Sequence, residues 1–251
     1  MDKTFTSAAR ALADLPSGAS LAVGGFGLCG VPTDLIDALV EGPAEDLRVI
    51  SNNCGIDDAG LGRLLAAGRI ARMTSSYVGE NKEFARRYLQ GELEVELVAQ
   101  GTLAERLRAG GSGIPAFYTP AGAGTLLAEG GLPWRYHTDG SVAVASPARE
   151  AREFGGRPYL LEEAIVCDFA LVRAAVGDRH GNLVFHAAAR NFNPLCAMAG
   201  RVTVAEVERL VEPGELDPGR VDLPGIFVQR VVAVRDPANK RIERRTTRGA
   251  A

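Results

Sequence analysis

The chain has 251 residues, of which 46% are hydrophobic and 24% are charged, and its formal net charge is −3 at pH 7. This composition is typical of a soluble globular protein with a sizeable core, and the slightly acidic balance argues against broad binding to nucleic acid or anionic membranes. No uninterrupted apolar run approaches the ~18 residues that a membrane-spanning helix needs. The first residues also lack a hydrophobic signal region, so we expect a cytoplasmic protein.

The first half of the chain alternates short apolar strands with helical stretches. Strands are predicted at Ser20–Val23, 48–50, Ile70–Ser75 and 92–97, and helices at 34–40, 61–67, 81–90 and 102–109. Thr33 and Thr102 are predicted to cap two of these helices. Charged and apolar residues alternate along 92–97, which predicts a strand with one solvent-exposed face. Repeated strand–helix units predict an α/β fold, a mainly parallel open sheet with helices on both faces. Functional groups are then expected at the carboxyl ends of the strands.

From residue 110 the texture changes. Two glycine-rich loops at 110–115 and 119–124 flank a short predicted strand, and the polar, turn-rich stretch at 131–158 predicts an additional β-rich excursion. Further strands are predicted at 160–165, 169–176, 202–211 and 225–234, before a basic tail at 240–245. We expect residues 1–251 to form a single domain.

Cysteine and histidine spacing predicts neither a metal site nor a disulfide framework. The four cysteines lie far apart in the sequence, without a C-x-x-C pair, so reduced thiols are expected. The histidines are scattered and match no metal-ligand or catalytic-triad spacing. They are His137, His180 and His186.

A glycine-rich run follows the strand at Ser20–Val23 and precedes a helix. Its candidate ligand-binding residues are Gly24, Gly25, Phe26, Gly27, Leu28, Cys29 and Gly30. Glycine lets a backbone approach a ligand closely, and the first N–H groups of a following helix attract anions. Three of these glycines satisfy the dinucleotide pattern G-x-G-x-x-G, which also requires an acidic residue about 20 positions further on. The next strand runs into Ser51-Asn52-Asn53 instead, which disfavours a nicotinamide dehydrogenase.

Several separated blocks carry a family resemblance. They are GGF at 24–26 with GVP at 30–32, SNN at 51–53, SYVGEN at 76–81, QGTLAER at 100–106, GIPAFYTP at 113–120 and ARNFN at 189–193. In order and along essentially the whole chain, they resemble the A (alpha) subunit of the family I CoA-transferases. Residues 77–81 and 131–158 resemble the 3-oxoacid (succinyl-CoA:3-ketoacid) type, with the acetate/butyrate and 3-oxoadipate types as alternatives.

This resemblance implies an activity and a partner. The expected enzyme moves CoA between an acyl-CoA, such as succinyl-CoA, and a 3-oxoacid, such as acetoacetate, through a glutamyl-CoA thioester. CoA is then a substrate, and no permanently bound cofactor is expected. The family's catalytic glutamate lies in a Ser-Glu-Asn-Gly motif of the B subunit, which this chain lacks, so we expect a hetero-oligomer. Gly79-Glu80-Asn81 belongs to the pattern of the A-type chain, and Glu80 is interpreted as stabilising a helix N-terminus.

Three amide side chains are the candidate catalytic groups. Gln100, at the exit of the strand at 92–97, corresponds by resemblance to the family's glutamine that faces the reacting carbonyl; helix capping is the alternative. Asn52 and Asn53 follow a strand and are suited to donate to a substrate carboxylate or an anhydride carbonyl, although Asx-turns use such pairs more often. Residues 24–30 are expected to contact CoA or the acyl group, and residues 113–124 to shape the same pocket.

A function of another class stays open. A non-catalytic ligand-binding module, such as a sugar-phosphate sensor, can share this sheet type. A helix-turn-helix segment would favour it, and the sequence shows none.

Overall fold

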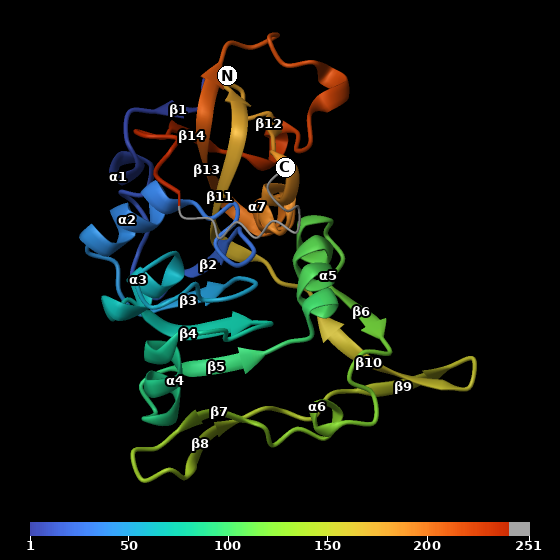
Figure 1. Ribbon diagram of the computed structural model, residues 1–251. Helices are drawn as coiled ribbons and strands as arrows, with labels where there is room; N and C mark the ends of the chain where they lie inside the picture. Colours follow the sequence, from blue (N-terminus) through green and yellow to red (C-terminus); the bar gives the residue numbers. More distant parts are fainter. Residues whose placement is uncertain (241–251) are drawn as a thin grey trace, which may run out of the picture.

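The computed structural model describes residues 1–240, and a nine-stranded sheet forms its centre (Figure 1). The order is β1-β14-β13-β11-β2-β3-β4-β5, with β12 paired to β11. All neighbours on that path are parallel, and only β12 is antiparallel. The strands are β1 (Thr4–Phe5), β2 (Ser20–Val23), β3 (Leu47–Ile50), β4 (Ile70–Ser75), β5 (Glu94–Leu97), β11 (Cys167–Asp178), β12 (Leu183–Val184), β13 (Gly200–Val211) and β14 (Arg230–Ala233).

Helices cover both faces of this sheet, as the sequence predicts. One face carries α1 (Ala8–Ala11), α2 (Thr33–Glu41), α3 (Leu61–Ala66) and α4 (Lys82–Leu89), and the other carries α5 (Gln100–Gly111) and α7 (Asn193–Ala199) (Figure 1). Each face has its own apolar core. Successive residues of β2 divide between them, because side chains alternate along a strand: Leu21 belongs to the first core and Ala22 to the second.

Two predicted helix caps are wrong. Thr33 is the first residue of α2, and its hydroxyl donates to the Val31 carbonyl rather than accepting from the helix. The helix α5 already begins at Gln100, so Thr102 lies buried inside it. At α4, by contrast, Asn81 is the N-cap, and its side-chain oxygen accepts from the N–H of Phe84 at 2.8 Å.

The predicted β-rich excursion is confirmed. Together with residues 116–129 and 159–163 on either side of the predicted 131–158, it comprises a three-stranded antiparallel sheet and a hairpin, with a short helix between them (Figure 1). The elements are β6 (Ala116–Thr119), α6 (Leu126–Glu129), β7 (Pro133–Tyr136), β8 (Val142–Ala145), β9 (Ala151–Phe154) and β10 (Arg157–Glu163).

The prediction that β5 has one solvent-exposed face is wrong at Glu96, which lies in a group of ion pairs beside this excursion. Glu96 is buried, and it pairs with Arg72 at 2.8 Å and Arg106 at 2.9 Å. Burial acts to raise the pKa of Glu96, but the two guanidinium groups hold this pKa below its usual range. Leu97, the next residue, is the exposed one.

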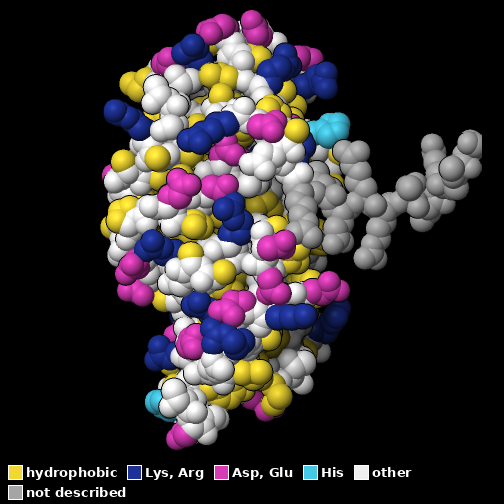
Figure 2. Space-filling model, turned by 60° about the vertical axis from the view of Figure 1, so that its left-hand side comes forward, with side chains coloured by type: hydrophobic (Ala, Val, Ile, Leu, Met, Phe, Trp, Pro, Cys, Tyr) yellow, Lys and Arg dark blue, Asp and Glu magenta, His cyan; other side chains and the backbone are white. Residues whose placement is uncertain are grey.

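The end of the described chain differs in part from the prediction. The stretch at 225–234 divides into a 3-10 turn, Gly225–Phe227, and β14. Of the predicted basic tail, Lys240 is described, and its Nζ donates to Glu208 at 2.6 Å; residues 241–245 lie outside the described residues. Within residues 1–240, no helix is both long and apolar enough to cross a membrane. Basic and acidic side chains are interspersed on the face seen in Figure 2.

Candidate active site

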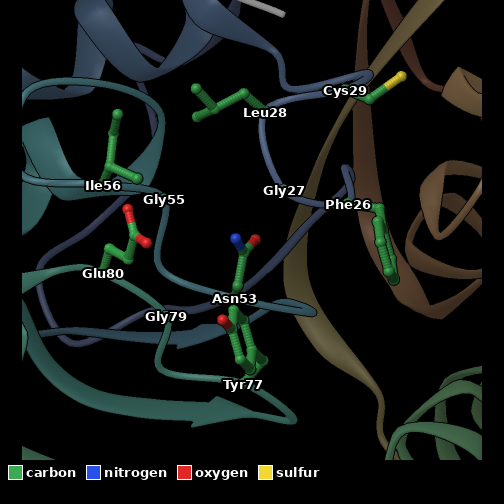
Figure 3. A pocket seen from close by; sticks show the side chains of 10 residues that line it. All are labelled: Phe26, Gly27, Leu28, Cys29, Asn53, Gly55, Ile56, Tyr77, Gly79 and Glu80. Atoms are coloured by element: carbon green, nitrogen blue, oxygen red, sulfur yellow. The ribbon is translucent and has the colours of Figure 1, made fainter. Parts of the chain in front are cut away.

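The loops after β2, β3 and β4 line a pocket of about 370 Å³ (Figure 3). They meet because parallel strands bring their carboxyl ends to one edge of the sheet. The lining residues are Phe26, Gly27, Leu28, Cys29, Asn53, Gly55, Ile56, Tyr77, Gly79 and Glu80.

Two of these loops, 25–30 after β2 and 55–60 after β3, have the same construction. Phe26 and Cys29 exchange backbone hydrogen bonds of 3.0 and 2.9 Å, and Ile56 and Ala59 exchange two of 3.2 Å. Each loop begins and ends at a glycine with left-handed φ, and a helix follows each. The glycines are Gly25 (φ 123°), Gly30 (φ 74°), Gly55 (φ 66°) and Gly60 (φ 62°).

Three of the four glycines at 24–30 pack closely against other residues of the chain. A Cβ on Gly24 would lie 1.9 Å from Oδ1 of Asn193, and one on Gly30 would lie 2.7 Å from its Nδ2. A Cβ on Gly25 would lie 2.8 Å from Cγ2 of Val31, just beyond the loop. Gly27 differs, because it has φ 57° and a Cβ there would have nothing within 4 Å among the described residues. Gly27 is therefore the glycine of this loop that leaves space for a ligand.

The neighbouring asparagines are both largely buried, but their amides differ in what they contact. Asn53 lines the pocket, and Figure 3 shows its amide directed into the space between Phe26 and Glu80. That amide forms no hydrogen bond with any residue in the described range. Asn52 is buried, and its Nδ2 donates to the Ser76 hydroxyl at 2.8 Å. Asn53 is thus available to a ligand, whereas Asn52 holds two loops together.

Gln100 lies at the same edge of the sheet but outside the pocket lining. It is the first residue of α5, directly after the short link from β5, and it is exposed. Its side chain has no hydrogen-bond partner within residues 1–240. None of the lining residues comes from 113–124. That stretch forms β6 and the loops on either side of it, so its predicted part in shaping the site is not seen in this pocket and stays a prediction.

Neutral hydrogen-bond donors and apolar groups dominate the pocket. Among its described lining residues Glu80 has the one carboxylate, and none is a lysine or an arginine. Burial raises the pKa of Cys29, with a smaller opposing effect of nearby Lys240, so this thiol is protonated at pH 7. Phe26 and Tyr77 are 50% and 61% exposed, which leaves their rings free to pack against an apolar ligand. The arrangement is suited to donating hydrogen bonds to a carbonyl oxygen or an oxyanion.

Sequence reasoning did not identify the second loop or Tyr77 as pocket residues. A signal for the loop was present in the sequence. Gly25-x₄-Gly30 is followed by the same spacing in Gly55-x₄-Gly60, and each pattern begins within five residues of the end of a predicted strand.

Comparison with known proteins gives consistent results. A family described as coenzyme A transferase matches residues 5–234. A Mycobacterium tuberculosis protein, named as the probable A-type chain of a succinyl-CoA:3-ketoacid coenzyme A transferase, is 66% identical over 248 residues, which cover 99% of this chain and 100% of that protein. A Helicobacter pylori protein, named as the A-type chain of the same kind of enzyme, is 51% identical over 250 residues, with full coverage of both chains.

Solved structures share the fold. The apoenzyme of an acyl-CoA transferase from Escherichia coli O157:H7 matches with a TM-score of 0.78 at 25% identity, over 95% of this chain. The chain spans 48% of that protein, about half its length. Glutaconate coenzyme A-transferase from Acidaminococcus fermentans has a TM-score of 0.77 at 19% identity, over 94% of this chain and 77% of that one, and supports the fold alone.

Proposed function

The chain belongs to the coenzyme A transferase family, and from this we propose that it is the A-type chain of a 3-oxoacid CoA-transferase. The reaction would move CoA between an acyl-CoA such as succinyl-CoA and a 3-oxoacid such as acetoacetate. The observation that carries the proposal is the full-length similarity to the mycobacterial relative with that activity in its name. The relatives' designation as A-type chains supports a B-type partner.

The nucleophile would come from the partner. Its glutamate carboxylate attacks the thioester carbonyl, and CoA leaves as a thiolate, so an acyl-glutamyl anhydride forms. The thiolate then attacks the glutamyl carbonyl, which gives a glutamyl-CoA thioester and releases the first carboxylate. The second carboxylate repeats the steps in reverse and leaves as the new acyl-CoA, which regenerates the glutamate.

This chain would supply hydrogen-bond donors to those steps. Each addition creates a tetrahedral oxyanion, and fixed donors at that oxygen are worth roughly 3–4 kcal/mol each. The Asn53 amide is suited to this because it lines the pocket and has no hydrogen-bond partner within residues 1–240. Gln100 would donate from outside the pocket lining, at the same edge of the sheet. The backbone of residues 24–30, above all Gly27, would lie against the acyl group or CoA. Asn52 would act on the site by supporting the loop, since its amide donates to Ser76.

The proposal is tested by reconstitution. The chain is purified alone and with a partner that carries the Ser-Glu-Asn-Gly motif, and transfer is assayed over matched pairs of acyl-CoA and carboxylate. We expect no turnover by the chain alone and turnover by the complex, fastest with succinyl-CoA and acetoacetate. The control is a complex in which the motif's glutamate is replaced by glutamine.

Two outcomes would overturn the proposal. The first is robust transfer by this chain in a preparation free of partner. The second is an intact complex that transfers CoA to none of the tested acceptors. Preference for acetate, butyrate or 3-oxoadipate over acetoacetate would instead assign the complex to one of the alternative types.

A further inference from the structure

A buried asparagine from a distant part of the chain holds the pocket's first loop. Asn193, the first residue of α7, is 0% exposed. Its Nδ2 donates to the carbonyl oxygens of Gly30 at 3.0 Å and Ala189 at 2.8 Å, and its Oδ1 accepts from the N–H of Arg173 at 3.0 Å. All of its amide's groups are therefore engaged, and one bond reaches a residue 163 positions away.

The contacts around this residue reach the end of the loop and the helix after it. Asn191 donates from Nδ2 to the carbonyl of Cys29 at 3.0 Å, next to the bond that Asn193 makes. The Arg173 side chain pairs with Glu206 at 2.9 Å, and Glu206 accepts the N–H of Leu35 in the first turn of α2. The end of the loop and the helix after it are thus held by these contacts, while Phe26 and Gly27 of the same loop line the pocket.

We propose that Asn193 is a positioning residue for the transfer reaction. Through Gly30, it sets where the loop places Phe26 and Gly27 beside Asn53. The kinetic part of this inference rests on the proposed function, whereas the structural part does not. Local geometry supports a specific role, since the 3-10 turn before Asn193 begins at Ala187, a non-glycine residue with φ 47°.

An amide is the required group at this position. Two carbonyl oxygens need a donor and one N–H needs an acceptor, which only asparagine provides at this size. In Asn193→Asp an ionised carboxylate would face the carbonyls of Gly30 and Ala189, and the loop would lose its donor. A buried carboxyl has a raised pKa, so the variant would regain an O–H donor as the pH is lowered.

The reactivity of Cys29 reports on how firmly the loop is held. Cys29 is partly exposed, whereas Cys54, Cys167 and Cys196 are 0% exposed. A disulfide reagent such as 5,5′-dithiobis(2-nitrobenzoate) therefore labels Cys29 first in the native protein. In Asn193→Asp we expect labelling of Cys29 about tenfold faster at pH 8, because buried hydrogen bonds are lost, while the other three thiols stay protected. The ratio of variant to wild-type rates should fall towards one at lower pH.

A matched control separates positioning from general destabilisation. Thr203 is also 0% exposed, and its hydroxyl donates to the carbonyl of Ala197 in α7 at 2.7 Å. Thr203→Val removes a buried hydrogen bond to the same helix without touching the loop. We expect this variant to lower the melting temperature but to leave the Cys29 labelling rate unchanged.

The kinetic test uses the complex with the B-type partner. We expect Asn193→Asp to lower kcat by about tenfold or more, in line with a misplaced site, with a smaller change in KM and with the complex intact. Thr203→Val should keep the wild-type kcat. If Asn193→Asp fails to fold, Asn191→Ala is the second variant, and it should speed Cys29 labelling by a smaller factor.

The outcomes are distinguishable. Unchanged Cys29 labelling in both the Asn193→Asp and Asn191→Ala variants would overturn the inference, as would equal losses of kcat in Asn193→Asp and Thr203→Val. A wild-type complex without any transferase activity would overturn the proposed function, and labelling would still decide whether Asn193 holds the loop.

Discussion

The two loops of the pocket have the same hairpin geometry but different anchors. The loop at 25–30 is held by Asn191 and Asn193, which lie more than 160 positions away in the chain. The loop at 55–60 is held by Asn81, whose Nδ2 donates to the carbonyl of Cys54 at 3.1 Å and whose Oδ1 caps α4. The second loop is therefore built from neighbouring strand–helix units, whereas the first depends on the fold of the C-terminal half.

The interiors of the loops differ in the same sense. A Cβ on Gly55 would lie 2.3 Å from the carbonyl oxygen of Ala59, so the second loop closes tightly on itself. The first loop leaves Gly27 open and Phe26 half exposed. The second loop, which follows Asn53, is tightly closed, whereas the position of the first loop is set by residues far away in the chain. Adjustment to a ligand is then expected in the first loop.

The largest expected effect concerns Asn53, which lies just before the second loop. In the complex, Asn53→Ala should lower kcat by on the order of 10²–10³, because an oxyanion donor is lost. The melting temperature should change little, since this amide has no partner in the described structure. Gln100→Ala should have a similar effect on kcat. Steady-state kinetics and thermal unfolding of each complex measure both quantities.

Asn52→Ala is the control for that prediction. Its amide is hydrogen-bonded to Ser76, so its loss should cost roughly 1–3 kcal/mol of stability. Near-normal turnover in Asn53→Ala would assign the donor role elsewhere. Near-normal turnover in Gln100→Ala would leave Gln100 with only its place at the start of α5.

Glycine substitutions test the difference in loop interiors. Gly55→Ala places a Cβ against backbone at a left-handed residue, and should reduce stability by about 3 kcal/mol. Gly27→Ala has the left-handed φ but open space, so about 1 kcal/mol is expected. For a chain of this length these losses correspond to roughly 6–12 °C and 2–4 °C in the melting temperature.

The same pair separates fold from function. In the complex, Gly27→Ala should raise KM for the acyl-CoA, because the added methyl group would enter the space left for a ligand. Gly55→Ala should have the smaller effect on KM once the experiment is run below its melting temperature. Equal thermal losses in the two variants would contradict the difference in packing described for the loops.

Apolar patterning predicted the sheet well. Ser20–Val23 and Ile70–Ser75 are strands with the predicted bounds, because each contains apolar residues that reach the core and is flanked by turn residues. The errors arise where partners come from elsewhere in the chain. Glu96 looks like a solvent-facing residue until Arg72 and Arg106 are placed beside it. The helix α7 was not predicted, since it is short, begins at Asn193-Pro194 and is largely buried.

The site was predictable in location more than in detail. Glycines and amides after parallel strands indicated the edge of the sheet at which the pocket lies. The sequence could not separate Asn52 from Asn53, because adjacent identical residues differ only in which side of the chain they face. It also gave no sign that Gly24 and Gly30 are required by Asn193, since such a contact depends on the fold of the whole chain.

The last expected effect concerns the helix that follows each loop. The Glu206 carboxyl group accepts the N–H of Leu35 in the first turn of α2 at 3.0 Å, whereas α3 has Gly60 at its N-cap and no side-chain cap within the described residues. Burial raises the pKa of Glu206 to about 8, and the adjacent Arg173 opposes this shift only in part. The folded protein therefore keeps a proton that the unfolded chain, with a pKa near 4.5, releases.

This difference sets the sign of a pH dependence. The contribution of Glu206 to stability is fully present below pH 4.5 and is lost as the pH rises towards 8, by up to ~1.4 kcal/mol per pH unit. Glu206→Gln cannot titrate, so its free energy of unfolding should fall less between pH 6 and 7 than that of the wild type. Parallel curves for wild type and Glu206→Gln in urea unfolding would show that Glu206 does not hold this proton.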